Sequence, residues 1–210
     1  MMVIAIENGG SSDARHFLDQ MFALRAKVFD ERLGWQVAAR GGQERDQFDD
    51  LDPVYILAVS AKNEVSGCAR LLPAMGQTML CPCSRTRLGA GVHPHARMIE
   101  SSRFCVDTTT QRKGRDGLHH ITRLMFAGIL EWCLSRGHTQ VVTVTDLAIE
   151  RILGRAGWLL RRLGPPQRVG RTRALAGVLA VDSGTFERLK PVGYVSTFDR
   201  PAAPTSSVLS

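Results

Sequence analysis

The order of secondary structure between residues 98 and 156 restricts the fold of this chain more than any other feature. The runs 98–107 and 141–145 have the composition of strands. Each is followed by a segment with apolar residues at helical spacing, 118–136 and 147–156, and a glycine ends each helix. A strand, helix, strand, helix order predicts an α/β fold in which some neighbouring strands are parallel.

The first third of the chain adds antiparallel strands to this unit. Residues 54–60 and 65–72 are apolar runs joined at Lys62-Asn63, which predicts a β-hairpin. A short strand is expected at residues 2–6. A helix follows, with an N-cap at residues 11–13 and an apolar face made by Phe17, Met21, Leu24 and Val28. Parallel and antiparallel pairs together predict a mixed central sheet.

One domain, residues 1–195, is the expected organisation. A chain of 210 residues is long enough for one α/β domain with a sizeable core, and neither repeats nor a linker divides it. A strand at residues 173–181 and a short helix at residues 185–189 complete the domain. Residues 196–210 are rich in proline, serine and small side chains, which indicates a loosely held C-terminal tail.

The charge of the chain indicates an acidic partner. The formal net charge is +7 and the pI is about 9.6, which suits nucleic acid, an anionic membrane surface or an acidic protein. The arginines are spread along the chain without a Lys/Arg tract and with little aromatic interleaving, so nucleic acid is not the expected partner.

Cysteine usage and hydropathy favour a cytoplasmic protein. The five cysteines are an odd number without a regular framework, which suggests reduced thiols. The first ten residues lack the basic and long apolar regions of a signal peptide, and no apolar run is long enough for a membrane span.

Charged residues inside strand-like runs are the first candidates for function. Glu100 and Arg103 lie within residues 98–107, and Arg70 lies beside two leucines in a hairpin strand. A charge that faces a core must be paired or functional, because burying it alone costs several kcal/mol. On an ideal strand Glu100 and Arg103 face apart, and a β-bulge would redirect one of them. The alternative is an edge strand with two solvated charges.

The segment between Asp30 and Asp52 has no periodicity, yet it contains Trp35 and a charged cluster. A patternless loop of this length inside a compact domain is either functional or disordered. We interpret it as a folded lid over a ligand, in which Asp46 and Asp49 pair with Arg70. The alternative is that both aspartates belong to a solvated turn.

A metal site is not expected. Cys81-Pro-Cys83 and His93-Pro-His95 supply four residues that could ligate a metal, but their spacing differs from that of zinc knuckles. A proline in each pair also limits how the ligands could converge.

Eight residues resemble, in order and spacing, the signature of the acyl-homoserine-lactone synthases, the autoinducer synthases of bacterial quorum sensing. They are Arg25, Phe29, Trp35, Asp46, Asp49, Arg70, Glu100 and Arg103. The resemblance covers roughly residues 1–195 and is strongest to synthases linked to plasmid conjugal transfer. Residues 81–97, rich in Cys, Arg, Gly and His, depart from the family pattern.

The resemblance implies a three-layer αβα sandwich similar to N-acetyltransferases. It also implies a reaction in which S-adenosylmethionine, a substrate rather than a cofactor, takes an acyl group from an acyl carrier protein. The products are an N-acyl-homoserine lactone, methylthioadenosine and free carrier, and a separate transcription regulator reads the lactone.

The resemblance also assigns residue roles. Glu100 and Arg103 are the catalytic positions, with Glu100 as the base that frees the methionyl amine. Ser102 and Thr143 match positions near the third acyl carbon, where a hydroxyl can bind a 3-oxo group of a medium-length chain. S-adenosylmethionine is bound by Arg25, Phe29, Trp35, Asp46, Asp49 and Arg70. The acidic carrier docks on Arg151, Arg155, Arg161 and Arg162.

Two other functions remain open at this point. An N-acetyltransferase that uses acetyl-coenzyme A would share the fold, but residues 111–116 end in Asp116 and do not fit its phosphate-binding loop. An inactive paralogue could act as a regulatory binding protein through its basic face. Acyl length, the oligomeric state and the choice between carrier protein and coenzyme A are not fixed by the sequence.

Overall fold

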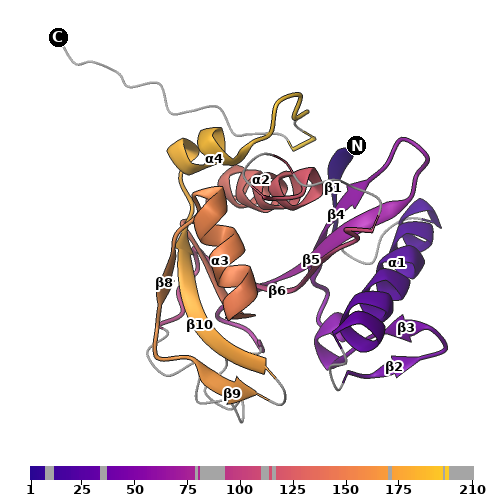
Figure 1. The fold of residues 1–210 in the computed structure, drawn as a ribbon, viewed down its shortest axis with the longest axis horizontal. Coiled ribbons are helices and arrows are strands. Elements are labelled where there is room, and N and C mark those ends of the chain that lie inside the picture. Colours follow the sequence, from indigo (N-terminus) through magenta and orange to yellow (C-terminus); the bar gives the residue numbers. More distant parts are fainter. Residues whose placement is uncertain are drawn as a thin grey trace.

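A mixed β-sheet forms the centre of the computed structural model, which describes residues 1–7, 12–33, 37–78, 80, 93–109, 114, 117–169, 172–195 and 197–198. Among these residues, eight strands form the sheet in the order β1-β4-β5-β6-β7-β10-β8, with β9 paired to β10 (Figure 1). The strands are β1 (Met2–Ile6), β4 (Val54–Val59), β5 (Val65–Pro73), β6 (Met98–Val106), β7 (Gln140–Asp146), β8 (Leu160–Arg162), β9 (Gln167–Val169) and β10 (Thr172–Ala180). Strands β6 and β7 are parallel, and the other described pairs are antiparallel.

Helices cover both faces of this sheet. Helix α1 (Ser12–Arg25) packs on β5 and β6, and α2 (His120–Ser135) packs on β1, β4 and β5. Helix α3 (Leu147–Ala156) contacts β7, β8 and β10, while α4 (Ser183–Leu189) contacts α2 (Figure 1). Two shorter helices and a small ribbon follow α1: the π-helix η1 (Ala26–Arg32), strands β2 (Ala39–Arg40) and β3 (Gln43–Glu44), and the 3₁₀-helix η2 (Gln47–Asp50).

Strand alternation places the two helical layers on opposite faces. Tyr55 and Leu57 of β4 belong to a buried cluster with residues of α1. Ile56 and Ala58, one position along, belong to the cluster with residues of α2 and α3. Because successive side chains of a strand point to opposite faces, α1 lies on one side and α2 and α3 lie on the other. The three-layer αβα sandwich with a mixed sheet is therefore confirmed.

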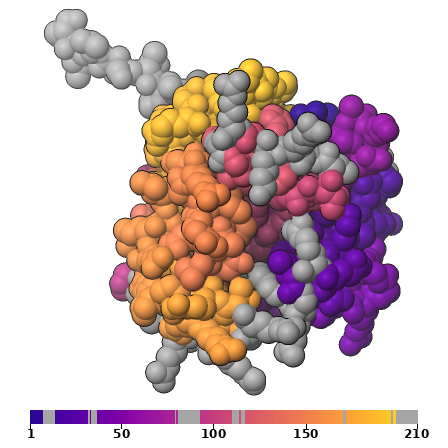
Figure 2. Space-filling view, viewed as in Figure 1, coloured from indigo at the N-terminus to yellow at the C-terminus, as the bar shows by residue number. Residues whose placement is uncertain are grey.

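The expected elements lie close to the observed ones. Helix α3 and strand β1 have the expected bounds, and α2 is shorter than expected by two residues at its start and one at its end. The stretch from Asp30 to Asp52 has more structure than its lack of periodicity suggested, since it contains the end of η1, the β2–β3 ribbon and η2. In the space-filling view, N-terminal segments in indigo and purple form one side of the molecule and C-terminal segments in orange form the other (Figure 2).

None of the helices in the described part of the chain is long and apolar enough to cross a membrane.

Candidate active site

Two aspartates at the start of η2 anchor the site. Asp46 is the N-cap of this helix and accepts a hydrogen bond from the backbone N–H of Phe48 (2.9 Å). Asp49 accepts one from the backbone N–H of Asp46 (2.8 Å), so the two side chains form a reciprocal capping box. These local hydrogen bonds hold both carboxylates against the backbone in addition to their contacts with arginines.

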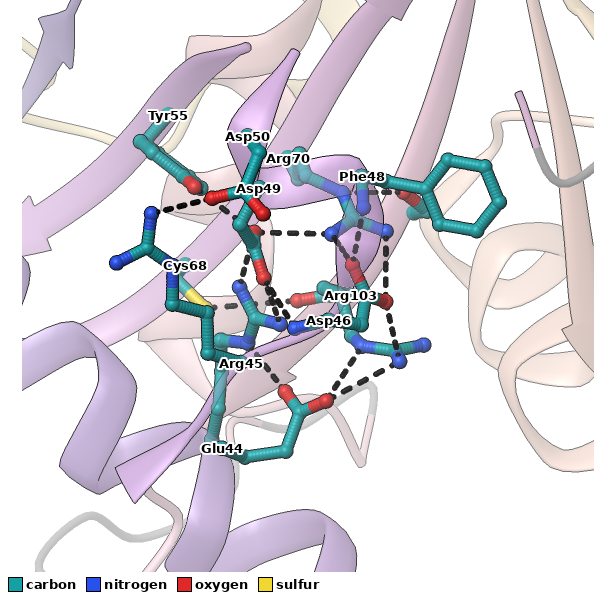
Figure 3. Close-up of polar contacts among 12 residues, drawn as sticks. Glu44, Arg45, Asp46, Phe48, Asp49, Asp50, Tyr55, Cys68, Arg70 and Arg103 are labelled. Carbon is teal, nitrogen blue, oxygen red and sulfur yellow. Dashed lines mark hydrogen bonds and ion pairs between the residues drawn. The ribbon is translucent and has the colours of Figure 1, made fainter. Parts of the chain in front are cut away.

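Two fully buried arginines bind these carboxylates from different elements. Arg25, the last residue of α1, donates to both carboxylate oxygens of Asp49 at 2.8 and 2.9 Å. Arg70 of β5 donates to Asp49 Oδ1 (2.9 Å) and to both oxygens of Asp46 (Figure 3). The expected pairing of Asp46 and Asp49 with Arg70 is therefore present, and Arg25 is a second partner of Asp49.

The charges of these arginines determine the ionisation of Asp49. Burial alone raises the pKa of Asp49, but hydrogen bonds from Arg25 and the charges of Arg25 and Arg70 outweigh it and hold the pKa well below its usual range. Burial and the charge of Asp49 raise the pKa of Tyr55, whose hydroxyl donates to Asp49 Oδ1 at 2.8 Å. Asp49 is thus a fixed carboxylate that accepts from three side chains.

A β-bulge brings Arg103 to the same cluster. Strands β5 and β6 pair Cys68 with Cys105 and Arg70 with Ser102, so two residues of β6 oppose Ala69. Arg103 occupies the bulge with φ of +53°, which is uncommon for a residue with a side chain. Its guanidinium contacts Glu44 Oε1 (3.1 Å) and Asp46 Oδ2 (2.6 Å).

The bulge changes which side chains of β6 share a face, compared with the ideal strand expected from the sequence. Arg103 lies on the same face as Ser102 and Glu100, because the extra residue shifts the alternation by one. Phe104 then points to the opposite face, where its ring stacks on Phe126 (centroids 5.1 Å apart). Glu100 and Arg103 therefore do not face apart as they would on an ideal strand, and Arg103 is the residue that the bulge redirects.

Two residues of the site were missed by sequence reasoning. Glu44 of β3 is fully buried and joins Arg25 to Arg103. Figure 3 shows Glu44 beside Arg103. Tyr55 supplies the hydroxyl that binds Asp49. Neither has a local signal, because Glu44 stands among other charged residues and Tyr55 fits an ordinary apolar strand. We refer to Arg25, Glu44, Asp46, Asp49, Arg70 and Arg103 as the ionic network.

A cavity of about 720 Å³ opens beside this network, where β6 and β7 part. The two strands pair from Met98 opposite Gln140 to Ser101 opposite Thr143. The residues that follow on each strand line the cavity, and so does Phe29 of η1. Its volume is in the range of small-molecule sites. The far side, which we call the apolar wall, consists of Phe126, Ile129, Val141, Leu153, Trp158 and Leu179.

The predicted site residues occupy different positions relative to the cavity. Phe29, Ser102, Arg103 and Thr143 line it. Arg25, Asp49 and Arg70 are buried behind Arg103, within the ionic network. The Phe29 ring centroid lies 5.8 Å from the Arg103 guanidinium carbon, a cation–π distance.

Glu100 is buried near the cavity without being part of its described lining. Only 1% of its surface is exposed, and its Oε2 accepts a hydrogen bond from the backbone N–H of Leu80 (3.1 Å). It lies two residues before Ser102 on the same face of β6.

The two hydroxyls assigned to the acyl chain already have partners. Ser102 Oγ accepts a hydrogen bond from Arg70 Nε (3.1 Å). Thr143 Oγ1 donates to the backbone oxygen of Ser101 (2.8 Å) across the parallel pair. The Thr143 hydroxyl has one hydrogen, so it must turn away from Ser101 to donate to a ligand.

The four arginines expected to bind the carrier are exposed on α3 and β8. Their charges differ in availability, because Arg162 forms a bidentate ion pair with Glu150 at 2.6 and 2.7 Å. Arg168 and Arg173, which sequence reasoning missed, are also exposed and lie directly opposite each other on β9 and β10. Like charges in register destabilise a strand pair unless other groups offset them.

Several expectations fall outside the described residues. Trp35, Cys81 and Cys83 are among these, as are the residues of the segment 111–116 other than Gly114. Within the described residues no group of three or more His, Cys, Asp or Glu side chains is arranged to hold a metal ion.

Comparison with known proteins identifies the family. A family model described as "Autoinducer synthase" matches residues 11–189. A "Probable acyl-homoserine-lactone synthase" of Sinorhizobium fredii is 48% identical, covering 96% of this chain and 100% of that protein. An acyl-homoserine-lactone synthase of Agrobacterium fabrum is 47% identical, covering 93% and 94%.

Solved structures agree with this result. A CoA-dependent acyl-homoserine lactone synthase, BjaI, with SAM and isopentyl-CoA has a TM-score of 0.78 at 27% identity, covering 90% of this chain and 87% of that one. The synthase LasI has a TM-score of 0.77 at 30% identity, covering 95% and 98%. An N-acetyltransferase-like structure from Lactobacillus plantarum, at 17% identity and a TM-score of 0.58, covers 86% and 99% and shares the fold. The chain therefore belongs to the autoinducer synthase family and is an acyltransferase.

Proposed function

We propose that this chain makes an N-acyl-homoserine lactone from S-adenosylmethionine and the acyl group of an acyl carrier protein. The observation that carries the proposal is the cavity between β6 and β7, which has Arg103 of the ionic network on one side and the apolar wall on the other. The two substrates require these two environments, because one is an ionic amino acid and the other a hydrocarbon chain. The proposal keeps the cytoplasmic location expected from the sequence and a separate transcription regulator as the reader of the lactone.

The amino-acid part of S-adenosylmethionine is assigned to the network side. Its carboxylate is a natural partner for Arg103, whose side chain is 15% exposed, whereas those of Arg25 and Arg70 are fully buried. Phe29 offers a ring face near the sulfonium. Arg25, Asp46, Asp49 and Arg70 hold Arg103 and the lid segment in place, and Trp35 is retained from the family resemblance.

The first bond joins the methionyl nitrogen to the acyl carbon. An ammonium has no lone pair, so it must lose a proton before its nitrogen attacks the thioester carbonyl. Glu100 is the proposed base and takes this proton through water, since it is buried on the same face of β6 as Ser102, which lines the cavity. Backbone N–H groups where β6 and β7 part are proposed to stabilise the negative charge on the carbonyl oxygen. The thiolate of the carrier then leaves and takes up a proton.

The second bond closes the lactone. The methionyl carboxylate attacks its own γ-carbon, and the carbon–sulfur bond breaks to release methylthioadenosine with the electron pair on sulfur. The sulfonium already makes this sulfur a good leaving group. The protein therefore needs mainly to hold the amino acid in a folded conformation.

The acyl chain is assigned to the apolar wall, with a 3-oxo chain of medium length as the expected donor. Ser102 and Thr143 line the cavity near the point where the strands part. Binding of a 3-oxo oxygen by Thr143 requires its hydroxyl to exchange the Ser101 oxygen for the substrate.

Acyl carrier proteins are acidic, and exposed arginines lie beside the cavity. Arg151 and Arg155 of α3, Arg161 of β8 and the opposed pair Arg168 and Arg173 form the proposed docking surface. Arg162 contributes less than the sequence suggested, because Glu150 compensates its charge.

The proposal is tested by incubating the purified, folded chain with S-adenosylmethionine and either a 3-oxo-octanoyl carrier protein or the matching coenzyme A thioester. Mass spectrometry should detect lactone and methylthioadenosine in equal amounts. The KM for the acyl carrier protein should be lower than the KM for the coenzyme A thioester. Faster use of the coenzyme A thioester would reassign the donor. Consumption of neither donor would refute the synthase function.

A further inference from the structure

Glu44 joins two arginines that come from different layers of the molecule. Its Oε2 accepts from Arg25 Nε of α1 at 2.6 Å. Its Oε1 accepts from Arg103 Nε of β6 at 3.1 Å (Figure 3). The carboxylate is fully buried on the short strand β3. Since a buried charge persists only when it is paired, both contacts are needed to keep Glu44 in place.

Arg103 is the arginine of the ionic network that reaches the cavity. It lines the cavity and is partly exposed, while Arg25 and Arg70 are fully buried. Its positive φ costs energy that the surroundings must offset, and Glu44 and Asp46 are the carboxylates that contact its guanidinium. The direction in which Arg103 points is therefore set by these two carboxylates.

The charges of the ionic network balance. Three arginines face three carboxylates, and Asp46 and Asp49 are also held by Arg70. Glu44 differs from both aspartates in its partners, because its carboxylate binds Arg25 and Arg103, whereas both aspartates bind Arg70. Neutralising Glu44 leaves the network with one excess positive charge and leaves Asp46 as the carboxylate that holds Arg103.

We propose that Glu44 is a positioning residue that aims Arg103 at the carboxylate of the amino-acid substrate. This inference rests on the proposed function, because it takes S-adenosylmethionine as the ligand of Arg103. Glu44 itself does not line the cavity in the described part of the chain, so its effect on the ligand passes through Arg103.

A double-mutant cycle tests this coupling. Dissociation constants for S-adenosylmethionine are measured by calorimetry on wild type, Glu44→Gln, Arg103→Ala and the double variant. We expect Glu44→Gln to weaken binding about tenfold and Arg103→Ala to weaken it about a hundredfold. In the Arg103→Ala background, Glu44→Gln should change the constant by less than about twofold, since its effect passes through the missing arginine.

Two controls separate positioning from a general loss of structure. Asp50→Asn removes a nearby carboxylate whose ion pair with Arg45 is exposed, and it should leave binding unchanged. Glu44→Asp keeps the charge but shortens the side chain, and it should bind S-adenosylmethionine between wild type and Glu44→Gln. In steady-state assays Glu44→Gln should raise the KM for S-adenosylmethionine and leave the KM for the acyl donor unchanged.

The outcomes are distinguishable. Suppose that wild type binds S-adenosylmethionine and that folded Glu44→Gln and Glu44→Asp bind it with the same dissociation constant. This result overturns the inference and leaves the proposed function intact. Equal effects of Glu44→Gln with and without Arg103 also overturn it. If wild type does not bind S-adenosylmethionine, the proposed function fails and the inference fails with it.

Discussion

On one side of the cavity, the ionic network holds Arg103 through Glu44 of β3 and Asp46, the N-cap of η2. On the other side, the apolar wall is built from side chains of α2, β7, α3 and β10 together with Trp158. Buried ion pairs add little net stability compared with apolar packing, but breaking one leaves an uncompensated charge. Apolar packing tolerates changes of shape if the volume is kept. The network therefore fixes a geometry, and the apolar wall sets a size.

The largest contrast is expected from Arg70→Ala. This change leaves Asp46 and Asp49 short of a buried partner, and it should cost roughly 3–5 kcal/mol of unfolding free energy and abolish turnover. Urea denaturation and mass spectrometry of lactone output are the measurements. Arg45→Ala, which removes an exposed pair with Asp50, is the control and should change neither. Near-normal output from Arg70→Ala would contradict the role of the network.

Acid should weaken the network before it affects the apolar wall. The folded-state pKa of Asp49 lies below its unfolded value, so the unfolded chain binds more protons as the pH falls. The contribution to stability is complete above the unfolded pKa of about 4 and is lost as the pH falls toward the folded pKa. Urea denaturation between pH 7 and pH 3 measures this loss.

A surface carboxyl provides the control for the acid experiment. Asp107 has a pKa lowered to about 2, chiefly by its hydrogen bond from Thr109, and is bound by Lys27. Asp107→Asn should keep most of the pH dependence if the buried network dominates. A flat profile in this variant would show that surface groups produce the effect.

Leu153→Ala should change size selection without changing the network. Leu153 is 3% exposed and belongs to the apolar wall, so truncation enlarges the cavity and costs about 2–5 kcal/mol. Longer acyl donors should gain relative to shorter ones by several-fold, while the KM for S-adenosylmethionine stays constant. Competition between donors of two lengths measures the ratio of their use. An unchanged ratio would mean that the acyl chain binds away from Leu153.

Raising the salt concentration should weaken binding that depends on the exposed arginines more than binding that depends on the buried ones. Surface charges are screened at high ionic strength, whereas buried pairs are screened much less. Raising salt from about 50 mM to about 500 mM should increase the KM for the acyl carrier several-fold and leave that for S-adenosylmethionine nearly constant. Arg168→Gln should reduce the salt dependence, and equal salt effects on both substrates would count against the docking surface.

The smallest expected effect belongs to Thr143→Val. The Thr143 hydroxyl already donates to Ser101, so it can add little to the binding of a 3-oxo group. Its removal should lower the preference of the enzyme for 3-oxo over unsubstituted donors by about a factor of two to five. The measurement compares 3-oxo and unsubstituted donors in wild type and variant. An unchanged ratio removes Thr143 from the acyl-chain assignment.

The sequence predicted the elements well, because apolar periodicity and glycine stops are local signals. It also indicated the pairing of Arg70 with Asp46 and Asp49, since an arginine among leucines requires a carboxylate. Glu44 could not be found this way, because it stands among other charged residues and not in an apolar run, so the sequence does not mark it as buried.

The position of the bulge and the location of the cavity could not be predicted from the sequence. A bulge between residues 98 and 107 was considered, but its position at Arg103 depends on the register between β5 and β6. The cavity depends on where the β6–β7 pairing ends, after Ser101 and Thr143. Both are properties of two strands together rather than of either sequence.

The most direct test of the account is a structure of the chain with S-adenosylmethionine bound. The account predicts that the ligand carboxylate contacts Arg103 and that the sulfonium lies near Phe29, at the point where β6 and β7 part. Density for the ligand in another part of the molecule, or in this cavity with its carboxylate away from Arg103, would contradict it.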